Sequence, residues 1–297
     1  MQADTARQAQ VSYARARETV EDLVDRMPDS AEDVRNLEVI CGREALLCQD
    51  LGDMDGALRL ARQALHLAEG FVRLMPKNVT AQRDLSVSQE RMGTLLQAMG
   101  SWREAGEYFD QALVNRRRLL RRAPDSVQLG RDVWQCLTKL GLLEQETGHI
   151  ERSRSRLEEA LELARAHLAR MPDSTTAQRD AANTYQKLGA VYQEAGELAE
   201  AERCLERSLA LARALQRQMP DSSEALQDLA VTHRSLATLY ARRGELAGAE
   251  TALRESLELS KTLCQRRPDS SAAARGLYLS CSRLGALAAQ WGDVEKA

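Results

Sequence analysis

One short turn motif recurs along the chain at a constant spacing. The sequence has six prolines, and each successive pair is 48 residues apart. Asp or Lys follows each proline, and Ser or Asn comes next. The motifs begin at Pro28, Pro76, Pro124, Pro172, Pro220 and Pro268. An internal period of about 20 to 50 residues is typical of a solenoid or a similar array of repeats. The spacing therefore predicts that the chain folds as a stack of similar units.

The sequence of each unit predicts two helices. Ser174 or Asp173 can cap a first helix, because the preceding proline cannot continue the helix before it. A glycine with the same period marks the end of this first helix, since glycine adopts the left-handed conformation without a Cβ clash. These glycines are Gly52, Gly100, Gly148, Gly196, Gly244 and Gly292. A second helix then runs from about Leu198 to near Met219 in the unit that begins at Pro172.

Both helices of this unit have an apolar stripe at three- and four-residue spacing, which is typical of a helix with one buried face. The stripe of the first helix is Ala181, Tyr185, Leu188, Tyr192 and Ala195, and that of the second is Ala201, Leu205, Leu209, Ala212 and Leu215. Two such helices per unit, stacked unit on unit, would bury one continuous core.

The pattern Leu188-Gly189, Tyr192, Gly196, Ala201 and Leu205, with a proline at the end of the unit, resembles the tetratricopeptide repeat. The resemblance covers essentially the whole chain, although Ser153 stands where the family has alanine. It implies an all-α, right-handed α-solenoid of antiparallel helix pairs. The usual unit of the family has about 34 residues, and we expect both helices here to be longer by about seven residues, or ~10 Å. Such long-helix arrays resemble those of large bacterial signalling proteins.

The repeats predict one array over residues 1–297. Residues 1–27 match a second helix alone, and residues 268–297 match a first helix alone. The full repeats between them are 28–75, 76–123, 124–171, 172–219 and 220–267. Because these ends are out of phase with the repeat, we expect a piece of a longer protein or an end covered by something else. A short natural protein with frayed ends is the other interpretation.

Composition limits the classes of partner and location. The net charge of −3 gives no overall field for nucleic acid or an anionic membrane. No apolar run approaches 18 residues and the N-terminus lacks an apolar signal core, so a cytoplasmic location is expected. The six cysteines form no CxxC pair and are expected to be reduced core residues. No cofactor and no metal ion are expected.

Two charged patterns favour structural roles. Arginine stands shortly before each proline, where a cation complements the dipole of a helix end. The densest arginine cluster, which includes Arg116, Arg117 and Arg118, is interpreted in the same way. Aspartates at Asp84, Asp132, Asp180 and Asp228 repeat with the period. Helices of neighbouring units pack about 8–10 Å apart, too far to share a metal ion, so a structural or solvated pair is predicted.

A row of glutamines is the candidate binding feature. Gln49, Gln97, Gln145 and Gln193 repeat with the period, and the row breaks at Ala241 and Ala289. The resemblance implies that this position on the first helix faces the concave groove, where amides could donate to and accept from a peptide backbone. Nearby groove candidates are Glu90, Thr138, Asn183, Gln186 and Arg234. The alternative is that these residues are only soluble helix formers, copied when the repeat was copied.

These patterns predict a scaffold or adaptor without catalysis that binds a protein or peptide on its concave surface. The four histidines share no repeat position, and no glycine-rich phosphate loop is present. The Lys and Asn clamp of the family's chaperone-tail binders is also missing at the matching positions. The alternative function is a sensor or regulatory arm of a bacterial kinase, protease or nucleotide switch. A pheromone receptor that controls transcription is disfavoured, because residues 1–27 match a repeat helix. End-to-end self-association of arrays is a further expectation.

Overall fold

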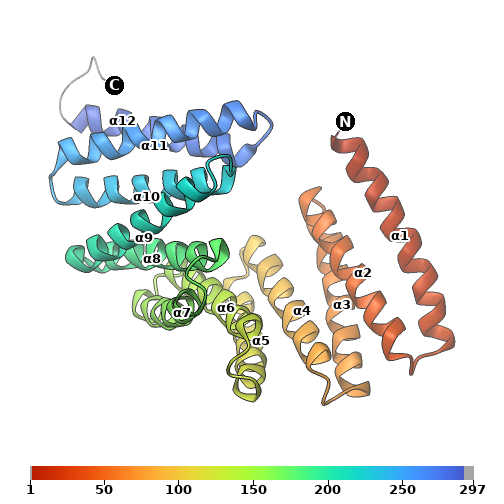
Figure 1. The fold of residues 1–297 in the computed structure, drawn as a ribbon. Coiled ribbons are helices and arrows are strands. Elements are labelled where there is room, and N and C mark those ends of the chain that lie inside the picture. Colours follow the sequence, from red (N-terminus) through yellow and green to blue (C-terminus); the bar gives the residue numbers. More distant parts are fainter. Residues whose placement is uncertain (1, 291–297) are drawn as a thin grey trace. The chain divides into compact units, whose positions relative to one another are not determined.

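The computed structural model describes residues 2–290 of the chain, and the side chains of residues 8–289. In this range every regular element is an α-helix, and the helices alternate between two classes (Figure 1). The first helices of the repeats are α2 (Ala31–Asp50), α4 (Val79–Ala98), α6 (Val127–Glu146), α8 (Thr175–Ala195), α10 (Ser223–Arg242) and α12 (Ser271–Gln290). The second helices are α1 (Gln2–Arg26), α3 (Met54–Leu74), α5 (Trp102–Arg122), α7 (Ile150–Arg170), α9 (Leu198–Gln218) and α11 (Leu246–Arg266).

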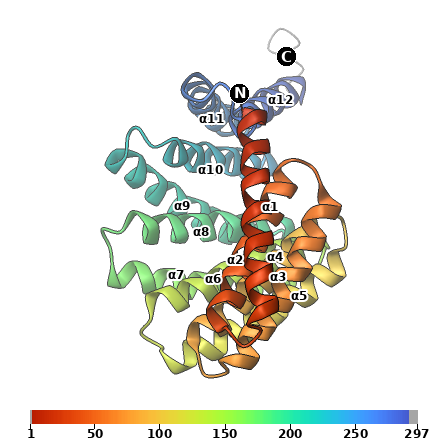
Figure 2. The same cartoon turned by 90° about the vertical axis from the view of Figure 1, so that its right-hand side faces the viewer.

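The chain forms two compact units, residues 1–143 and 144–297. In unit 1, α1 packs on α2, and each of α2, α3 and α4 packs on the helix that follows it. In unit 2, α7 to α12 pack in the same consecutive manner, as Figure 2 shows for this stack. First helices also contact one another directly, α2 with α4, α8 with α10, and α10 with α12. The all-α architecture of stacked antiparallel helix pairs is therefore confirmed.

The helix ends lie where the turn motif predicts them. Ser174 caps α8, since its side chain accepts a hydrogen bond from the backbone N–H of Ala177. Asn78 does the same for α4, with bonds from Thr80 and Ala81. The five turn glycines that the structure describes have φ between 78° and 82°. This left-handed region favours glycine, which explains why the residue recurs. Gly292 lies outside the described residues.

The two helices of a repeat approach closely at a second glycine. A Cβ atom added at Gly93 in α4 would lie 2.7 Å from the Phe109 ring and 3.1 Å from the carbonyl oxygen of Ala105 in α5. At Gly189 in α8 the corresponding neighbour is Leu205, at 2.8 Å. Glycine is therefore required by the contact between the helices at these positions, which is where the sequence pattern places the crossing.

Most of the predicted core is buried, with two corrections. Ala181, Leu188, Ala201, Leu205, Ala212 and Leu215 are buried. Ala195 is exposed, because it ends α8 beside the turn glycine. Four cysteines are buried, but Cys264 is half-buried and Cys281 is exposed on α12, so the expectation of core cysteines is wrong for Cys281. Burial raises the pKa of the Cys136 thiol to about 12, and that of Cys204 to about 11.

Candidate functional site: the face of the first helices

The predicted groove residues lie on one face of each first helix. In α4, Val87, Glu90, Thr94 and Gln97 follow one another at three- and four-residue spacing, so they share a face. We use the name first-helix row for this face and its equivalents in the other repeats. The predicted members of the row are Gln49, Glu90, Gln97, Thr138, Gln145, Asn183, Gln186, Gln193 and Arg234. Two exposed apolar side chains, Leu46 of α2 and Val87 of α4, belong to the same face.

The four glutamines of the row lie in different environments. Gln49 and Gln97 are half-buried in unit 1. In unit 2, the half-buried Gln145 donates a 2.6 Å hydrogen bond to the Glu194 carboxylate of the next repeat. Gln193 is only 4% exposed, and its amide donates to the backbone oxygen of Ser235 at 3.4 Å. Gln193 therefore joins α8 to α10, whereas the other three reach the surface.

The remaining members of the row differ in how much they reach the surface. Thr138 is buried and donates to the backbone oxygen of Trp134, one turn earlier in α6. Gln186 donates to the Ser235 hydroxyl at 2.9 Å and so links α8 to α10. Asn183 and Arg234 are half-buried. Gln186 and Gln193 thus make a double amide contact with one residue of the next repeat, Ser235.

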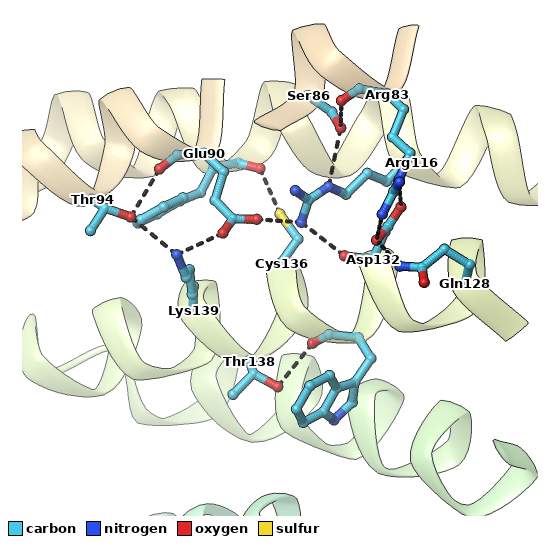
Figure 3. Close-up of polar contacts among 12 residues, drawn as sticks. Arg83, Ser86, Glu90, Thr94, Arg116, Gln128, Asp132, Cys136, Thr138 and Lys139 are labelled. Carbon is cyan, nitrogen blue, oxygen red and sulfur yellow. Dashed lines mark hydrogen bonds and ion pairs between the residues drawn. The ribbon is translucent and has the colours of Figure 1, made fainter. Parts of the chain in front are cut away.

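Glu90 belongs to a buried network of charges in unit 1 (Figure 3). Its carboxylate forms ion pairs with Arg116 of α5 and with Lys139 of α6, the latter at 2.6 Å. Burial raises the pKa of the Glu90 carboxyl, but the two cations more than offset this, so the net pKa is below its ordinary value. Lys139 also donates to the Thr94 hydroxyl at 3.1 Å. Glu90 thus links three helices of the unit.

Sequence reasoning missed the role of Arg116. It assigned this residue to an arginine cluster that complements the dipole of a helix end, but the side chain is 3% exposed in the core. Its guanidinium donates to the Ser86 hydroxyl and to the backbone oxygen of Asp132, besides its ion pair with Glu90. The signal was present: Arg116 follows Ala112 by four residues, in the apolar stripe of its helix.

The repeating aspartates form ion pairs between successive first helices, which confirms the structural interpretation. Each pair joins an arginine to the aspartate 49 residues further on, one residue more than the period. The pairs are Arg35 with Asp84 at 2.7 Å, Arg83 with Asp132 at 2.6 Å, and Arg179 with Asp228 at 2.8 Å. We call these pairs the Arg–Asp ladder. The ladder holds neighbouring repeats in register within each unit.

The rungs of the ladder are expected to differ in strength. Asp132 has a side chain 7% exposed and accepts two bonds from Arg83 and one from Gln128, whereas Asp84 is 19% exposed and accepts one from Arg35. Asp132→Ala should therefore lower the free energy of unfolding by about 1–3 kcal/mol. Asp84→Ala should cost less than about 1 kcal/mol, because the pair is more solvated. Urea denaturation of both variants measures the difference, and equal losses would contradict it.

Among the described residues, no group of three or more His, Cys, Asp and Glu side chains could hold a metal ion. None of the described helices is both long and apolar enough to cross a bilayer. Of the histidines, His233 is buried in α10, with its Nδ1 atom 2.9 Å from the Glu255 carboxylate. Burial lowers the pKa of His233 despite this carboxylate.

Comparisons with known proteins agree with this geometry. A family model described as tetratricopeptide repeat matches residues 181–215 and 229–270. No curated protein has a significant sequence match. The structure is similar to that of BtubC (BKLC) from P. vanneervenii, with 21% identity, a TM-score of 0.66, and coverage of 87% of this chain and 92% of that one.

Two further solved structures are similar. The tetratricopeptide-like repeats of a putative kinesin light chain from Podospora anserina have 18% identity and a TM-score of 0.55, covering 76% of this chain and 95% of that one. The apo form of RapI has 12% identity and a TM-score of 0.60, covering 92% of this chain and 69% of that one. The family model thus identifies tetratricopeptide repeats over residues 181–215 and 229–270, and the stacked helix pairs with their close glycine crossings give the described chain the fold of such repeats.

Proposed function

We propose that the protein is a non-catalytic interaction scaffold that binds an extended segment of a partner protein along the first-helix row of unit 1. The observation that carries this proposal is the chemistry of the row where it reaches the surface. Exposed Leu46 and Val87 share the face of α2 and α4 that also includes the half-buried amides Gln49 and Gln97. Apolar anchors with amides beside them suit a peptide, because an amide can both donate to and accept from its backbone.

The frame beneath the row also supports binding. The Arg–Asp ladder and the Glu90 network fix the first helices of unit 1 relative to one another. A pre-formed surface loses little conformational entropy when a partner binds, so more of the contact energy appears as affinity. The partner we propose is a protein or peptide, or another domain of the same protein. The residues of unit 1 expected to contact it are Gln49 and Gln97. In unit 2, Gln145 and Gln193 are bonded to the next repeat, Gln193 through the packing of α8 on α10.

A peptide-display selection on the purified protein tests this function. Peptides that are enriched should lose at least about tenfold in affinity when Gln49 and Gln97 are together replaced by arginine, whose charged side chain cannot accept a hydrogen bond. Gln218→Arg is the control, because Gln218 is exposed on a second helix. Equal affinity for the double variant and the control would exclude the row as the binding surface. Failure to enrich any peptide would contradict the proposed binding of an extended segment.

A further inference from the structure

The polar network of Figure 3 has an altered counterpart three repeats further along the chain, in unit 2. The counterpart of Glu90 is Arg234 in α10, and that of Arg116 is Ser260 in α11. The ladder aspartate Asp132 corresponds to Gly276 in α12, and its partner Arg83 to Gln227. Both carboxylates of the first network are therefore missing from the second.

Other contacts of the two networks are the same, so the two sites can be compared directly. Lys139 donates to the Thr94 hydroxyl in unit 1, and its counterpart Arg283 donates to the equivalent hydroxyl of Thr238 at 2.9 Å. Arg283 also donates to the backbone oxygen of Arg234. Unit 2 thus keeps a cation, Arg283, at the position of Lys139. At the position of Glu90 it has a second cation, Arg234, in place of a carboxylate.

A cavity of about 550 Å³ lies between α10, α11 and α12, next to the positions where these carboxylates are missing. Its lining includes Gln227, Arg234, Ser260, Arg275 and Gly276. A Cβ atom added at Gly276 would lie 3.6 Å from the Ser260 hydroxyl and 4.0 Å from an Arg234 nitrogen, which is ordinary contact distance. The space at Gly276 therefore opens directly onto the groups that a ladder carboxylate would meet.

Two polar groups in this cavity lack the partners that their counterparts have. The Ser260 hydroxyl is buried, with the residue 1% exposed, and makes no hydrogen bond in the described part of the chain. Arg234 donates to the Ser256 hydroxyl at 3.3 Å but forms no ion pair with any described carboxylate. Burial and the nearby charge of Arg283 lower the pKa of Arg234, so its charge lies in an environment that disfavours cations. An anion beside this half-buried cation would therefore stabilise it.

We propose that the cavity between α10, α11 and α12 binds a carboxylate, which takes the place of the missing ladder aspartate. Arg234 supplies a planar fork of donors that matches a carboxylate, and the Ser260 hydroxyl donates from the floor. Arg275, exposed at the rim, supplies a second cation. The site lies between helices and includes a second-helix residue, so it differs from a clamp formed on the exposed faces of first helices alone. It depends on its own geometry and does not require the glutamines of the first-helix row.

Calorimetric titration of the full chain with malonate, at constant ionic strength set with sodium chloride, tests the site. Wild-type protein should bind malonate saturably, and Gly276→Ala should bind with similar affinity because it adds no charge. Gly276→Asp restores the ladder carboxylate, and Arg234→Gln removes the fork. Each should weaken binding about tenfold or more, because the new aspartate competes with malonate for Arg234 and the glutamine removes a charge-assisted contact. Arg43→Gln, which removes an exposed arginine of α2, controls for net charge and should bind like wild type.

A second titration tests whether the carboxylate belongs to a protein side chain or to a free small molecule. It compares a short capped peptide that contains glutamate with the same peptide in which glutamine replaces the glutamate. Binding of the glutamate peptide at least as tightly as malonate assigns the site to an acidic side chain of a partner. Binding of malonate alone assigns it to a free carboxylate. Absence of binding for both, or undiminished malonate binding by Gly276→Asp, overturns the proposal. Neither titration changes the glutamines that the scaffold test replaces, so failure here is distinct from failure of the proposed scaffold function.

Discussion

Replacing Arg116 by leucine is expected to lower the free energy of unfolding by about 3–5 kcal/mol. The leucine would fill much of the space of the arginine stem, so the loss is electrostatic rather than a packing defect. It removes one of the two ion pairs of Glu90, whose side chain is 16% exposed, and leaves the pair with Lys139. The Ser86 hydroxyl and the backbone oxygen of Asp132 each lose a donor as well. Urea denaturation followed by circular dichroism measures the change.

The matched control is Arg103→Leu, because Arg103 is exposed on the same helix and pairs with Glu107 in solvent. This variant should change stability by less than about 1 kcal/mol. A double replacement, Glu90→Leu with Arg116→Leu, should recover much of the loss, since no charge then remains buried without its partner. If the double variant were as unstable as the sum of the single variants, the ion pair would not be the cause.

The loss caused by Arg116→Leu should also depend on pH. Because the folded-state pKa of Glu90 is lowered, its contribution to stability is present above the unfolded pKa of about 4.3 and disappears as pH falls through the folded value. Protonation removes the charge that Arg116 neutralises. The difference between wild type and variant should therefore shrink as the pH is lowered below about 4. A difference that stayed constant with pH would indicate that packing, not charge, accounts for the loss.

Gly93→Ala is expected to destabilise unit 1 by about 1–3 kcal/mol, although alanine favours helix over glycine. The added methyl group would lie 2.7 Å from the Phe109 ring, which is fully buried and cannot move aside without opening the contact of α4 with α5. Urea denaturation measures the loss of stability. Hydrogen exchange should show lower protection of the backbone amides of α4 and α5, where the clash occurs.

Gly130→Ala is the control for Gly93→Ala. Gly130 lies within α6 with nothing in reach of a new Cβ atom, so the same change should stabilise by about 0.5–1 kcal/mol. Combining Gly93→Ala with Phe109→Leu should cost less than the sum of the two separate changes, because the smaller side chain relieves the clash. Additive losses would show that the two side chains do not meet.

Prediction from the sequence was most successful where the signal is local. The proline, the capping Ser or Asn and the turn glycine act on backbone torsions within a few residues of themselves, so their period located the helix ends. The crossing at Gly189 was also predictable, because only a residue without a Cβ atom fits a contact that close. The pattern of the repeat therefore determined the helix pairs and the order in which they stack.

Prediction failed where a side chain depends on what the next repeat places beside it. The arginines and aspartates of the ladder were visible as columns, but the partner of Arg83 lies 49 residues away, and adjacency in sequence could not identify it. Gln97 and Gln193 occupy equivalent positions, yet Gln193 is buried against Ser235 while Gln97 is half-buried. Identical residues in a repeat acquire different roles because their neighbours have diverged.

The sequence by itself determined the fold of this protein, through a period in residues that act on the local backbone. Only the tertiary structure decided which charges are buried, which are neutralised and where a carboxylate is missing. Arg116 and Arg234 are both arginines on amphipathic helices, but the first has Glu90 as its partner and the second is beside the space left by Gly276. Electrostatic and hydrogen-bond energies change over a few ångströms, and such distances are set by the packing of helices far apart in sequence.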